Sequence, residues 1–574
     1  MPLGTFDRNE NIANLTEGTF DVLVIGGGIT GAGVALDAAS RGLRTALVER
    51  DDFASGTSSK SSKLIHGGLR YLQNGDVRLV YDALRERQRL LRNAPHLVEV
   101  LPFLIPVFEG KGGIIPKRLA RALGSAMWMY DLTGGLRIGK RHRRLGRGAA
   151  LAHMPTLVER VAWAYLYYDA QADDARLTLT VARTAALDFG ATVVNHAAVA
   201  AIVKDERGRV AGAIVDTGAG TAGEIEVRAR VVINATGVWA DDVRALDEGT
   251  NPNSIRPAKG VHIAVPWRKL RNDIAAVVPV RQDRRSVFVV PWPTPRSNGD
   301  EGAALDEAGA DSRVTYIGTT DTDYDGDVDD PQCTPEDVAY LLDAINHAIS
   351  EPLQESDVLG TWAGLRPLIR DASNSRTADL SRRHRVLTSN SGMITVTGGK
   401  LTTYREMAED AVDAAVTALA SAGEPLPRRA RRSRTRSLDL RGAAGWREAR
   451  ERDPHLGRRY GGEAAVVEAV IAADPTTAEA LVPGLPYRRA EALYAARYEM
   501  AVTLDDVLSR RTRSRLLRRD ATAAAAPDVA QLLAAELGWS EAECAAQVDR
   551  FRTALARERE VPGLAEHVVV AGGG

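Results

Sequence analysis

The chain has 574 residues, of which 44% are hydrophobic and 26% are charged. This composition is typical of a folded globular protein, and the length suffices for on the order of two to four domains. The 74 lysines and arginines balance 75 aspartates and glutamates, so net charge favours neither a nucleic acid nor a membrane as a partner. Only two cysteines occur, Cys333 and Cys544, and their wide separation argues against a thiolate metal site or a disulfide scaffold. We expect no bound metal ion and no nucleic acid.

The N-terminal segment from Met1 to Thr19 is polar and carries several acidic residues. It lacks the basic and apolar regions of a secretory signal, and no run in the chain approaches the roughly 18 apolar residues that span a bilayer. We therefore expect a cytoplasmic protein, whose closest approach to lipid is peripheral contact with the inner face of the cell membrane.

A glycine-rich turn near the N-terminus carries the strongest functional signal. The apolar run Val22–Ile25 predicts a buried strand, and glycines follow it directly at positions 26, 27, 28 and 31. Such glycines permit a tight turn, let backbone approach a pyrophosphate and let the next helix pack closely. A helix over Val34–Arg41 then points unpaired N–H groups at the phosphates. A second strand, Arg44–Val48, ends in Glu49, which is placed to accept the ribose hydroxyls of an adenosine. This unit predicts dinucleotide binding.

Two later turns have the same character. Asn234–Gly237 follows a buried strand, and Thr397–Lys400 follows another and leads into a helix predicted over Tyr404–Ala420. A strand, glycines and a helix start can place backbone donors beside a flavin ring, where negative charge develops at N1 and O2. Because the chain returns to phosphate-friendly turns, FAD is favoured over NAD as the cofactor.

Periodicity predicts the remaining elements. An amphipathic helix is expected over residues 77–94, where leucines recur among arginines and glutamates. Another helix, over 334–351, begins with a capping Thr334 and Pro335. Strands are predicted over 192–196, 199–203, 210–216, 224–234, 260–265, 287–290 and 314–318. The composition changes near residue 425, and beyond it alanine, leucine, arginine and glutamate recur at helical spacing, which predicts a helical C-terminal domain over 426–574.

Several motifs together resemble those of one enzyme family. They are Gly26–Gly33, Ser61–Leu72, Asn234–Gly237, Gly318–Asp321, Gly364–Pro367 and Gly398–Tyr404. The chain resembles the FAD-dependent glycerol-3-phosphate dehydrogenases from about residue 19 to 420, with the motifs in the family's order, and its tail resembles their C-terminal domain more loosely. The resemblance implies an α/β fold with a two-dinucleotide-binding-type FAD domain, interleaved with a mixed-sheet substrate domain over residues 1–425. The FAD parts are expected at approximately 19–90, 180–250 and 355–425.

The implied reaction is oxidation of sn-glycerol 3-phosphate to dihydroxyacetone phosphate, with FAD as the hydride acceptor and a membrane quinone as the next electron acceptor. In a related oxidase branch, oxygen takes the electrons and peroxide is released. Two further interpretations are a flavoenzyme that oxidises an amine or an amino acid and a non-catalytic FAD-binding protein. The sequence does not separate a monomer from a homodimer.

A phosphate dianion requires fixed cations, and arginine suits it because its planar fork binds phosphate bidentately. We predict Arg70, assisted by the Tyr71 hydroxyl, and Arg366 in this role, and the resemblance implies both at the substrate. Lys400 is predicted to neutralise either the phosphate or the reduced flavin. Thr319, Thr320 and Asp321 are predicted to shape the wall of the substrate domain.

The alcohol proton requires a base, and histidine is favoured because its ordinary pKa lies near the working pH. Two of the ten histidines lie in site-like motifs, His66 and His262, and the sequence does not separate them. We predict contacts with FAD at Gly26, Gly27, Gly28, Ile29, Thr30, Gly31, Glu49, Arg50, Thr57, Ser58, Ser62, Lys63, Leu64, Ala235, Thr236, Gly237, Lys400, Leu401 and Thr402.

Access to a quinone requires the membrane surface, and two basic runs are candidates for contact with anionic lipid. One is Lys140–Arg144, preceded by Trp128, Met129 and Tyr130, and the other is Arg428–Arg436. Each lysine or arginine near an anionic surface contributes about 1 kcal/mol, so either run suffices for peripheral binding. A solvated loop or linker is the competing interpretation of each.

Overall fold

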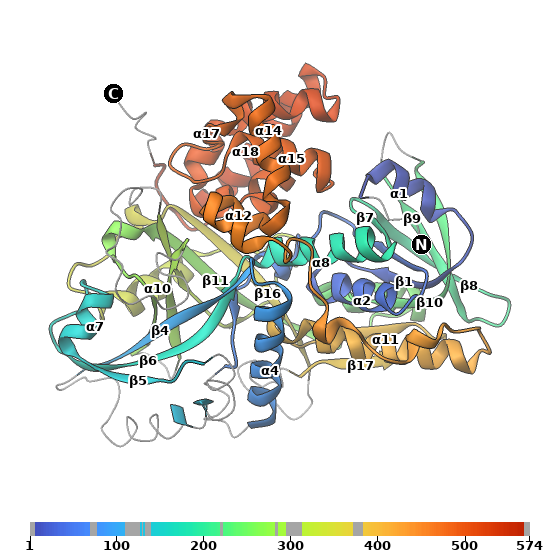
Figure 1. The fold of residues 1–574 in the computed structure, drawn as a ribbon, viewed down its shortest axis with the longest axis horizontal. Helices are drawn as coiled ribbons and strands as arrows, with labels where there is room; N and C mark the ends of the chain where they lie inside the picture. Colours follow the sequence, from blue (N-terminus) through green and yellow to red (C-terminus); the bar gives the residue numbers. More distant parts are fainter. Residues whose placement is uncertain are drawn as a thin grey trace.

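The computed structural model describes residues 6–68, 77–108, 127–128, 130–131, 139–218, 222–281, 285–293, 313–370 and 383–567. Of the residues named above, Met1, Arg70, Tyr71, Leu72 and Met129 lie outside these ranges. Figure 1 shows three bodies: a sheet with helices around β1 and β10, a second sheet around β4, β6 and β11, and a group of helices from the C-terminal part of the chain.

The first body contains a mainly parallel sheet with the strand order β17-β18-β10-β1-β2-β7, hereafter the parallel sheet. Its strands are β1 (Phe20–Ile25), β2 (Thr45–Val48), β7 (Thr192–Val194), β10 (Glu224–Asn234), β17 (Arg385–Thr388) and β18 (Ile394–Thr397). Among these described strands, only β17 runs antiparallel to its neighbour. The strands β8 (Ala198–Lys204) and β9 (Val210–Asp216) extend β10 as an antiparallel flap.

Helices α2 (Ile29–Ser40), α8 (Asp174–Phe189) and α11 (Tyr404–Ser421) share one core with the parallel sheet, with α2 packed between the other two. A further helix, α9 (Ala240–Glu248), contacts β10, β18 and the flap. A short helix, α1 (Arg8–Leu15), packs beside β7. The predicted start of α2 at Val34 is wrong, because the helix already begins at Ile29. Glycines depress helix propensity in isolation, but Gly31 and Gly33 lie inside α2 at close backbone and side-chain approaches that only glycine permits. Tertiary packing therefore outweighs local propensity here.

The second body contains a mixed sheet with the order β15-β11-β14-β13-β12-β4-β6-β3, in which β16 also pairs with β11 and β5 with β6. Its longer strands are β4 (Val98–Phe108), β6 (Val161–Ala172), β11 (Ile255–Pro266), β13 (Ser286–Trp292) and β16 (Gly360–Ile369). The shorter strands are β3 (Leu64–Ile65), β5 (Arg143–Gly146), β12 (Ala275–Pro279), β14 (Val314–Gly318) and β15 (Thr322–Asp323). All described pairs are antiparallel except β4 with β12.

Helices cover both faces of the mixed sheet. One face packs on α10 (Pro335–Asn346) and α7 (Arg147–His153) through a core that includes Leu341 and Ile263. The predicted cap at Thr334 is confirmed, and its capping box is closed by the Asp337 side chain. The other face packs on α4 (Val77–Asn93), whose predicted amphipathic span is also confirmed. This second face turns toward the parallel sheet.

The C-terminal domain is helical, as predicted. It contains α12 (Trp446–Arg452), α13 (Pro454–Tyr460), α14 (Ala464–Ala473), α15 (Arg489–Tyr498), α16 (Ser514–Leu517), α17 (Arg519–Leu537) and α18 (Glu541–Glu560). Leu481, Val507, Leu533 and Phe551 lie in its main apolar core. Within the described part of the chain, no helix has both the length and the apolar character needed to cross a bilayer. These elements confirm the predicted α/β fold with a mixed-sheet second domain and a helical C-terminal domain.

Candidate active site

Four predicted segments meet at one edge of the parallel sheet. The strands β1, β2, β10 and β18 are parallel, so their carboxyl ends lie at the same edge. The residues that follow these ends are Gly26–Gly31, Glu49–Arg50, Ala235–Gly237 and Gly398–Thr402, which together we name the cofactor edge. Ligands of open α/β sheets bind outside this end of the strands. The three small-residue turns, far apart in the sequence, therefore face a single ligand position.

Backbone forms the floor of the cofactor edge. A Cβ atom on Gly31 would lie 1.8 Å from the Gly26 carbonyl oxygen, and one on Gly26 would lie 2.9 Å from the Ala235 oxygen. Gly26 also has φ of +107°, a left-handed conformation that side chains disfavour. By contrast, nothing lies within 4 Å of a Cβ built on Gly237. The edge therefore has closely packed backbone beneath an open space, a cradle that suits a pyrophosphate.

Glu49 is fixed at this edge. Its Oε2 accepts a hydrogen bond from the Gly27 N–H at 2.5 Å, and its Oε1 accepts one from the Asp51 N–H at 2.9 Å. Burial raises the pKa of the Glu49 carboxyl, and the two N–H donors oppose that rise. Arg50 instead turns outward, donating to Asp329 at 2.8 Å and covering the Trp239 ring. Of Glu49 and Arg50, it is therefore the Glu49 side chain that lies in the cradle of the cofactor edge.

A polar segment, Thr57–Leu64, joins the two sheets, and we name it the bridging segment. Its Ser58 Oγ accepts a hydrogen bond from the Ile29 N–H in the first turn of α2 at 2.9 Å. Its Thr57 hydroxyl donates to the carbonyl of Leu365 on β16 at 2.5 Å. One end of the segment therefore contacts both the predicted phosphate-binding turn and the strand that carries Arg366.

His66 lies where the cofactor edge meets the mixed sheet. Its N–H donates to the Thr402 hydroxyl oxygen at 3.2 Å, and that hydroxyl donates to the His66 carbonyl at 3.4 Å. The half-buried imidazole stands edge-on to Phe288 of β13, with ring centroids 6.0 Å apart. Lys400, two residues before Thr402, is also half-buried. His66 and Lys400 are thus both brought to the junction between the two predicted ligands.

His262 occupies a closed position on β11. Directly opposite residues of antiparallel strands share a face, and His262 is opposite both Trp362 and Gly318. Its ring stacks on Trp362 with centroids 4.8 Å apart and planes 10° apart, and only 2% of the residue is exposed. Its Nε2 hydrogen bonds to the Ser62 hydroxyl at 2.9 Å, whereas Nδ1 has no partner among the residues that the structure describes.

The charge state of His262 follows from this burial. Burial holds the pKa of His262 well below its usual range, and the nearby cations of Lys63 and Arg366 lower it further. The imidazole is therefore neutral at neutral pH. One ring nitrogen is fixed by Ser62, and the other is a buried polar atom in need of a partner.

Arg366 lies on the same face as His262, because alternate residues of β16 share a face. Its Nη1 donates to Asp321 at 3.1 Å, and its Nη2 contacts the Thr319 hydroxyl and the Thr320 carbonyl, each at 3.3 Å. The predicted Thr319–Asp321 wall is thus brought to the guanidinium. About a quarter of the Arg366 side chain stays exposed, at 23%.

Two glycines of this face lie beneath different groups: Gly260 lies beneath Arg366, whereas a Cβ on Gly364 would lie 2.5 Å from the Lys60 carbonyl oxygen. Gly260 and Gly364 are paired across β11 and β16, between the Arg366 position and the His262–Trp362 pair. A Cβ on Gly260 would lie 2.6 Å from both Arg366 Nη2 and the Thr319 hydroxyl. We name the face that carries Gly260, His262, Trp362, Gly364 and Arg366 the substrate face. It holds a cation and a neutral imidazole beside the bridging segment, and these two groups suit a small anion with a hydroxyl group.

Sequence reasoning missed several of these relationships. It did not predict that Ser62 contacts His262, that Trp362 stacks on that histidine, or that Gly260 and Gly364 lie opposite each other. It also gave no sign that the buried amine of Lys63 forms an ion pair with Asp174 at 3.0 Å, and the contact of Lys63 with FAD stays a prediction. All these contacts depend on strand register and on the packing of distant segments, for which the local sequence gives no signal.

Comparisons with known proteins agree with this geometry. A family model described as FAD dependent oxidoreductase matches residues 21–405, and one described as the C-terminal domain of alpha-glycerophosphate oxidase matches residues 433–544. Glycerol-3-phosphate dehydrogenase 2 of Mycobacterium tuberculosis (strain ATCC 25618 / H37Rv) is 37% identical over 557 residues, covering 94% of this chain and 88% of the relative. The mitochondrial glycerol-3-phosphate dehydrogenase of Mus musculus is 39% identical over 553 residues, covering 91% and 71% respectively.

Solved structures give the same result. The glycerol-3-phosphate dehydrogenase of Bacillus halodurans, complexed with FAD, superposes with a TM-score of 0.71 at 29% identity and covers 96% of each chain. The L-alpha-glycerophosphate oxidase of Mycoplasma pneumoniae, with FAD bound, is only 18% identical with a TM-score of 0.51, so it shows the shared fold alone. The first family model spans both the cofactor edge and the substrate face.

Proposed function

This chain belongs to the family of FAD-dependent glycerol-3-phosphate dehydrogenases, and on that premise we propose that it oxidises sn-glycerol 3-phosphate to dihydroxyacetone phosphate. The observation that carries the proposal is the substrate face, where Arg366 and the neutral His262 lie on one face of the mixed sheet. This face lies next to the cofactor edge, since the bridging segment contacts both.

The cofactor edge fits FAD. The N-terminus of α2 and the packed backbone of Gly26–Gly31 would hold the pyrophosphate, and Glu49 would accept the ribose hydroxyls. Lys400–Thr402, beside His66, would lie near the ring. When bound, FAD supplies the acceptor for the hydride that leaves C2 of the alcohol.

The substrate phosphate would bind at Arg366. Asp321 and the Thr319 hydroxyl hold the guanidinium over Gly260, so its fork is oriented before substrate arrives. Arg70 and Tyr71 keep their predicted role at the same phosphate. Lys400 remains the predicted cation for either the phosphate or the reduced flavin.

We assign the base to His262. Its Nδ1 is the buried atom without a described partner, and a substrate hydroxyl would supply that partner. The Nε2–H then donates to the Ser62 oxygen, which leaves Nδ1 free to take the hydroxyl proton as the hydride leaves. His66 stays the second candidate, because it is half-buried beside Thr402.

The test is anaerobic addition of sn-glycerol 3-phosphate to the purified yellow protein, followed by a soluble quinone or by oxygen. We expect the flavin absorbance to bleach and to recover rapidly with quinone alone, which identifies a dehydrogenase. Rapid recovery with oxygen and release of peroxide would identify an oxidase instead. If the flavin does not bleach, the substrate assignment is wrong.

Delivery of electrons to a membrane quinone requires a lipid-facing surface, which we propose at the first basic run. Arg141, Arg143 and Arg144 are exposed on or beside the edge strand β5, and the nearby Trp128 is 58% exposed and stands edge-on to His142. The second run packs instead on the parallel-sheet domain, where Arg434 donates to the Ser40 carbonyl and Arg436 pairs with Glu409.

Co-sedimentation with anionic liposomes at low salt tests this surface. Replacing Arg141, Arg143 and Arg144 with Gln should abolish binding, because about 1 kcal/mol per cation is lost. The matched control replaces the exposed Arg431 and Arg432 with Gln and should bind as before. Equal binding by all three proteins would contradict the assignment. The homodimer remains a separate prediction.

A further inference from the structure

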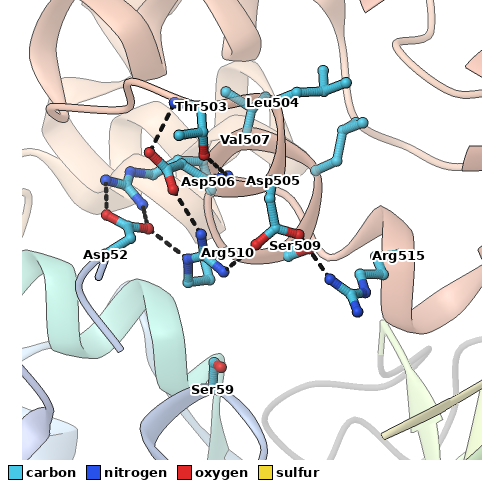
Figure 2. A network of polar contacts seen from close by, with 12 residues as sticks. Asp52, Ser59, Thr503, Leu504, Asp505, Asp506, Val507, Ser509, Arg510 and Arg515 are labelled. Carbon is cyan, nitrogen blue, oxygen red and sulfur yellow. Dashed lines mark hydrogen bonds and ion pairs between the residues drawn. The ribbon is translucent and has the colours of Figure 1, made fainter. Parts of the chain in front are cut away.

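The C-terminal domain contacts the parallel-sheet domain through buried ion pairs around a π-helical turn, Asp506–Arg511. Arg511 donates to both oxygens of Asp52, at 2.6 and 2.9 Å, and Arg510 donates to Asp52 at 2.6 Å. Figure 2 shows Arg510 between Asp52 of one domain and Asp505 and Asp506 of the other. Asp52 lies three residues after Glu49, so this contact begins next to the cofactor edge.

The acidic groups here are neutralised by neighbouring side chains rather than by a metal ion. Oxygen or nitrogen atoms of Asp52, His196 and Asp506 lie within 4.8 Å of one another, a spacing compatible with a metal site. However, the Asp52 oxygens accept from two guanidinium groups, and Asp506 accepts from Arg510, His196 and two backbone N–H groups. Arginine thus supplies the positive charge, and we assign this cluster to domain docking.

A third arginine reaches further into the other domain. Arg513, just beyond the turn, is fully buried, at 0% exposure. Its Nη2 donates to the Ser59 carbonyl at 2.5 Å and to Asp174 at 2.7 Å. The Lys63 amine donates to the same two groups, at 3.2 and 3.0 Å. Arg513 of the C-terminal domain and Lys63 of the bridging segment therefore share two acceptors, the Ser59 carbonyl and the Asp174 carboxylate.

The bridging segment also contacts His262. The second oxygen of Asp174 accepts from the N–H and the hydroxyl of Ser61, at 3.0 and 2.6 Å. The next residue, Ser62, bonds to His262 through its hydroxyl, and its carbonyl accepts from Tyr316 at 2.9 Å. Direct contacts thus connect Arg513 to the imidazole of the substrate face through Asp174, Ser61 and Ser62.

We propose that Arg513 is a positioning residue for the oxidation, through which the C-terminal domain holds the bridging segment and, with it, the Ser62–His262 contact. This inference rests on the proposed function. Without the guanidinium, the Ser59 carbonyl and the shared Asp174 oxygen lose one of their two cationic donors, and the segment is free to shift. A displacement of about 1 Å in a reacting group can slow a reaction by up to about 100-fold.

Two variants and one control test the proposal by anaerobic rapid mixing with sn-glycerol 3-phosphate. In Arg513→Gln we expect FAD to stay bound and the limiting rate of flavin reduction to fall about tenfold or more. The substrate concentration for half-maximal rate should change little, because Arg366 is untouched. Arg513→Lys should restore part of the rate, since it keeps the charge but loses the fork. The control, Arg515→Gln, loses ion pairs with Asp505 and Glu558 inside the C-terminal domain and should keep the wild-type rate.

The pH profile separates positioning from a general structural role. Burial and the positive charge of Arg513 together lower the pKa of Lys63 to about 8, against the opposing effect of Asp174 and Asp173. His262 is a further titratable group near the amine. Removing Arg513 removes a like charge, so the pKa of Lys63 should rise. An alkaline fall in the flavin-reduction rate near pH 8 should therefore move to higher pH in Arg513→Gln.

Each outcome decides the question. A wild-type rate and an unmoved pH profile in FAD-loaded Arg513→Gln would overturn the proposal, as would an equal loss of rate in Arg515→Gln. Should Arg513→Gln fail to fold, Arg513→Lys carries the test, because a full rate of flavin reduction in that variant, which lacks the fork, also overturns the proposal. If the flavin of the wild-type protein does not bleach with sn-glycerol 3-phosphate, the substrate assignment is wrong, and the role of Arg513 in this oxidation is wrong as well.

Discussion

The cofactor edge is formed mainly by backbone atoms, whereas the substrate face is formed mainly by side chains. At the cofactor edge, backbone of Gly26 and Gly31 packs against other backbone, and a single added carbon atom would collide with it. On the substrate face, side chains dominate, and we propose that those of His262 and Arg366 carry the chemistry. The first region is thus sensitive to any added atom, whereas the second is sensitive to which functional group is removed.

This difference separates the expected phenotypes. Damage to the cofactor edge should remove FAD and, with it, every later step. A substitution on the substrate face should leave FAD bound. Depending on the residue, it should impair either substrate binding or flavin reduction. The three predictions that follow test this separation, beginning with the largest effect on turnover.

We expect Gly31→Ala to lose FAD. The new Cβ would lie 1.8 Å from the Gly26 carbonyl oxygen, so the turn must open to admit it. Overpacking of this kind costs about 3 kcal/mol or more, which corresponds to roughly 100-fold weaker FAD binding or greater, and turnover should vanish with the flavin. Flavin absorbance per protein after purification measures the loss. Gly148→Ala, where nothing lies within 4 Å of the added carbon, is the matched control. Normal flavin content in Gly31→Ala would contradict a backbone floor.

The same difference explains what the sequence predicts well. The cofactor edge comes from contiguous motifs, in which a strand, glycines and Glu49 follow at fixed spacing, so FAD was predictable, and family membership confirms it. The family itself was recognisable from the same kind of local string, and the comparisons confirm it. The first turn of α2 was misjudged, because tertiary packing there tolerates glycines inside a helix.

The substrate face was less predictable. Arg366, His262 and Asp321 were each chosen from separate motifs, but their relation depends on the register that pairs β11 with β14 and β16. Register is set by the whole sheet and cannot be deduced from one strand. The docking of Arg513 on Asp174 joins two residues that are 339 positions apart in the chain. The individual site residues and domain boundaries therefore remain predictions that mutation must test.

His262→Ala should leave FAD bound but slow flavin reduction by roughly 10²–10⁴-fold, the usual contribution of a positioned base. The pH dependence of the flavin-reduction rate is a second test of His262 as the base. A base acts only when deprotonated, and burial holds the pKa of His262 well below its usual range. The rate should therefore not fall as the pH is lowered through about 6.5, the ordinary value for histidine, and should fall only in more acidic solution.

His66→Ala provides the comparison within the same site. If flavin reduction is slow in His66→Ala and normal in His262→Ala, the base is His66. Wild-type rates of flavin bleaching in both variants would eliminate a histidine base altogether. Rapid mixing at several pH values, with the flavin content of each variant measured first, separates these outcomes from simple loss of cofactor.

Arg366→Ala should have the smallest and most selective effect. Hydrogen bonds to charged groups contribute about 1.5–3 kcal/mol, so KM for sn-glycerol 3-phosphate should rise roughly 10- to 150-fold, while FAD stays bound and His262 keeps its contact with Ser62. Arg366→Lys should lie between, because it keeps the charge without the fork. The control is Arg256→Ala, which removes an arginine from the same strand pair that is bonded to the exposed Asp323, and it should leave KM unchanged. An unchanged KM in Arg366→Ala would place the phosphate elsewhere, and the wall of Thr319–Asp321 would then have a structural role only.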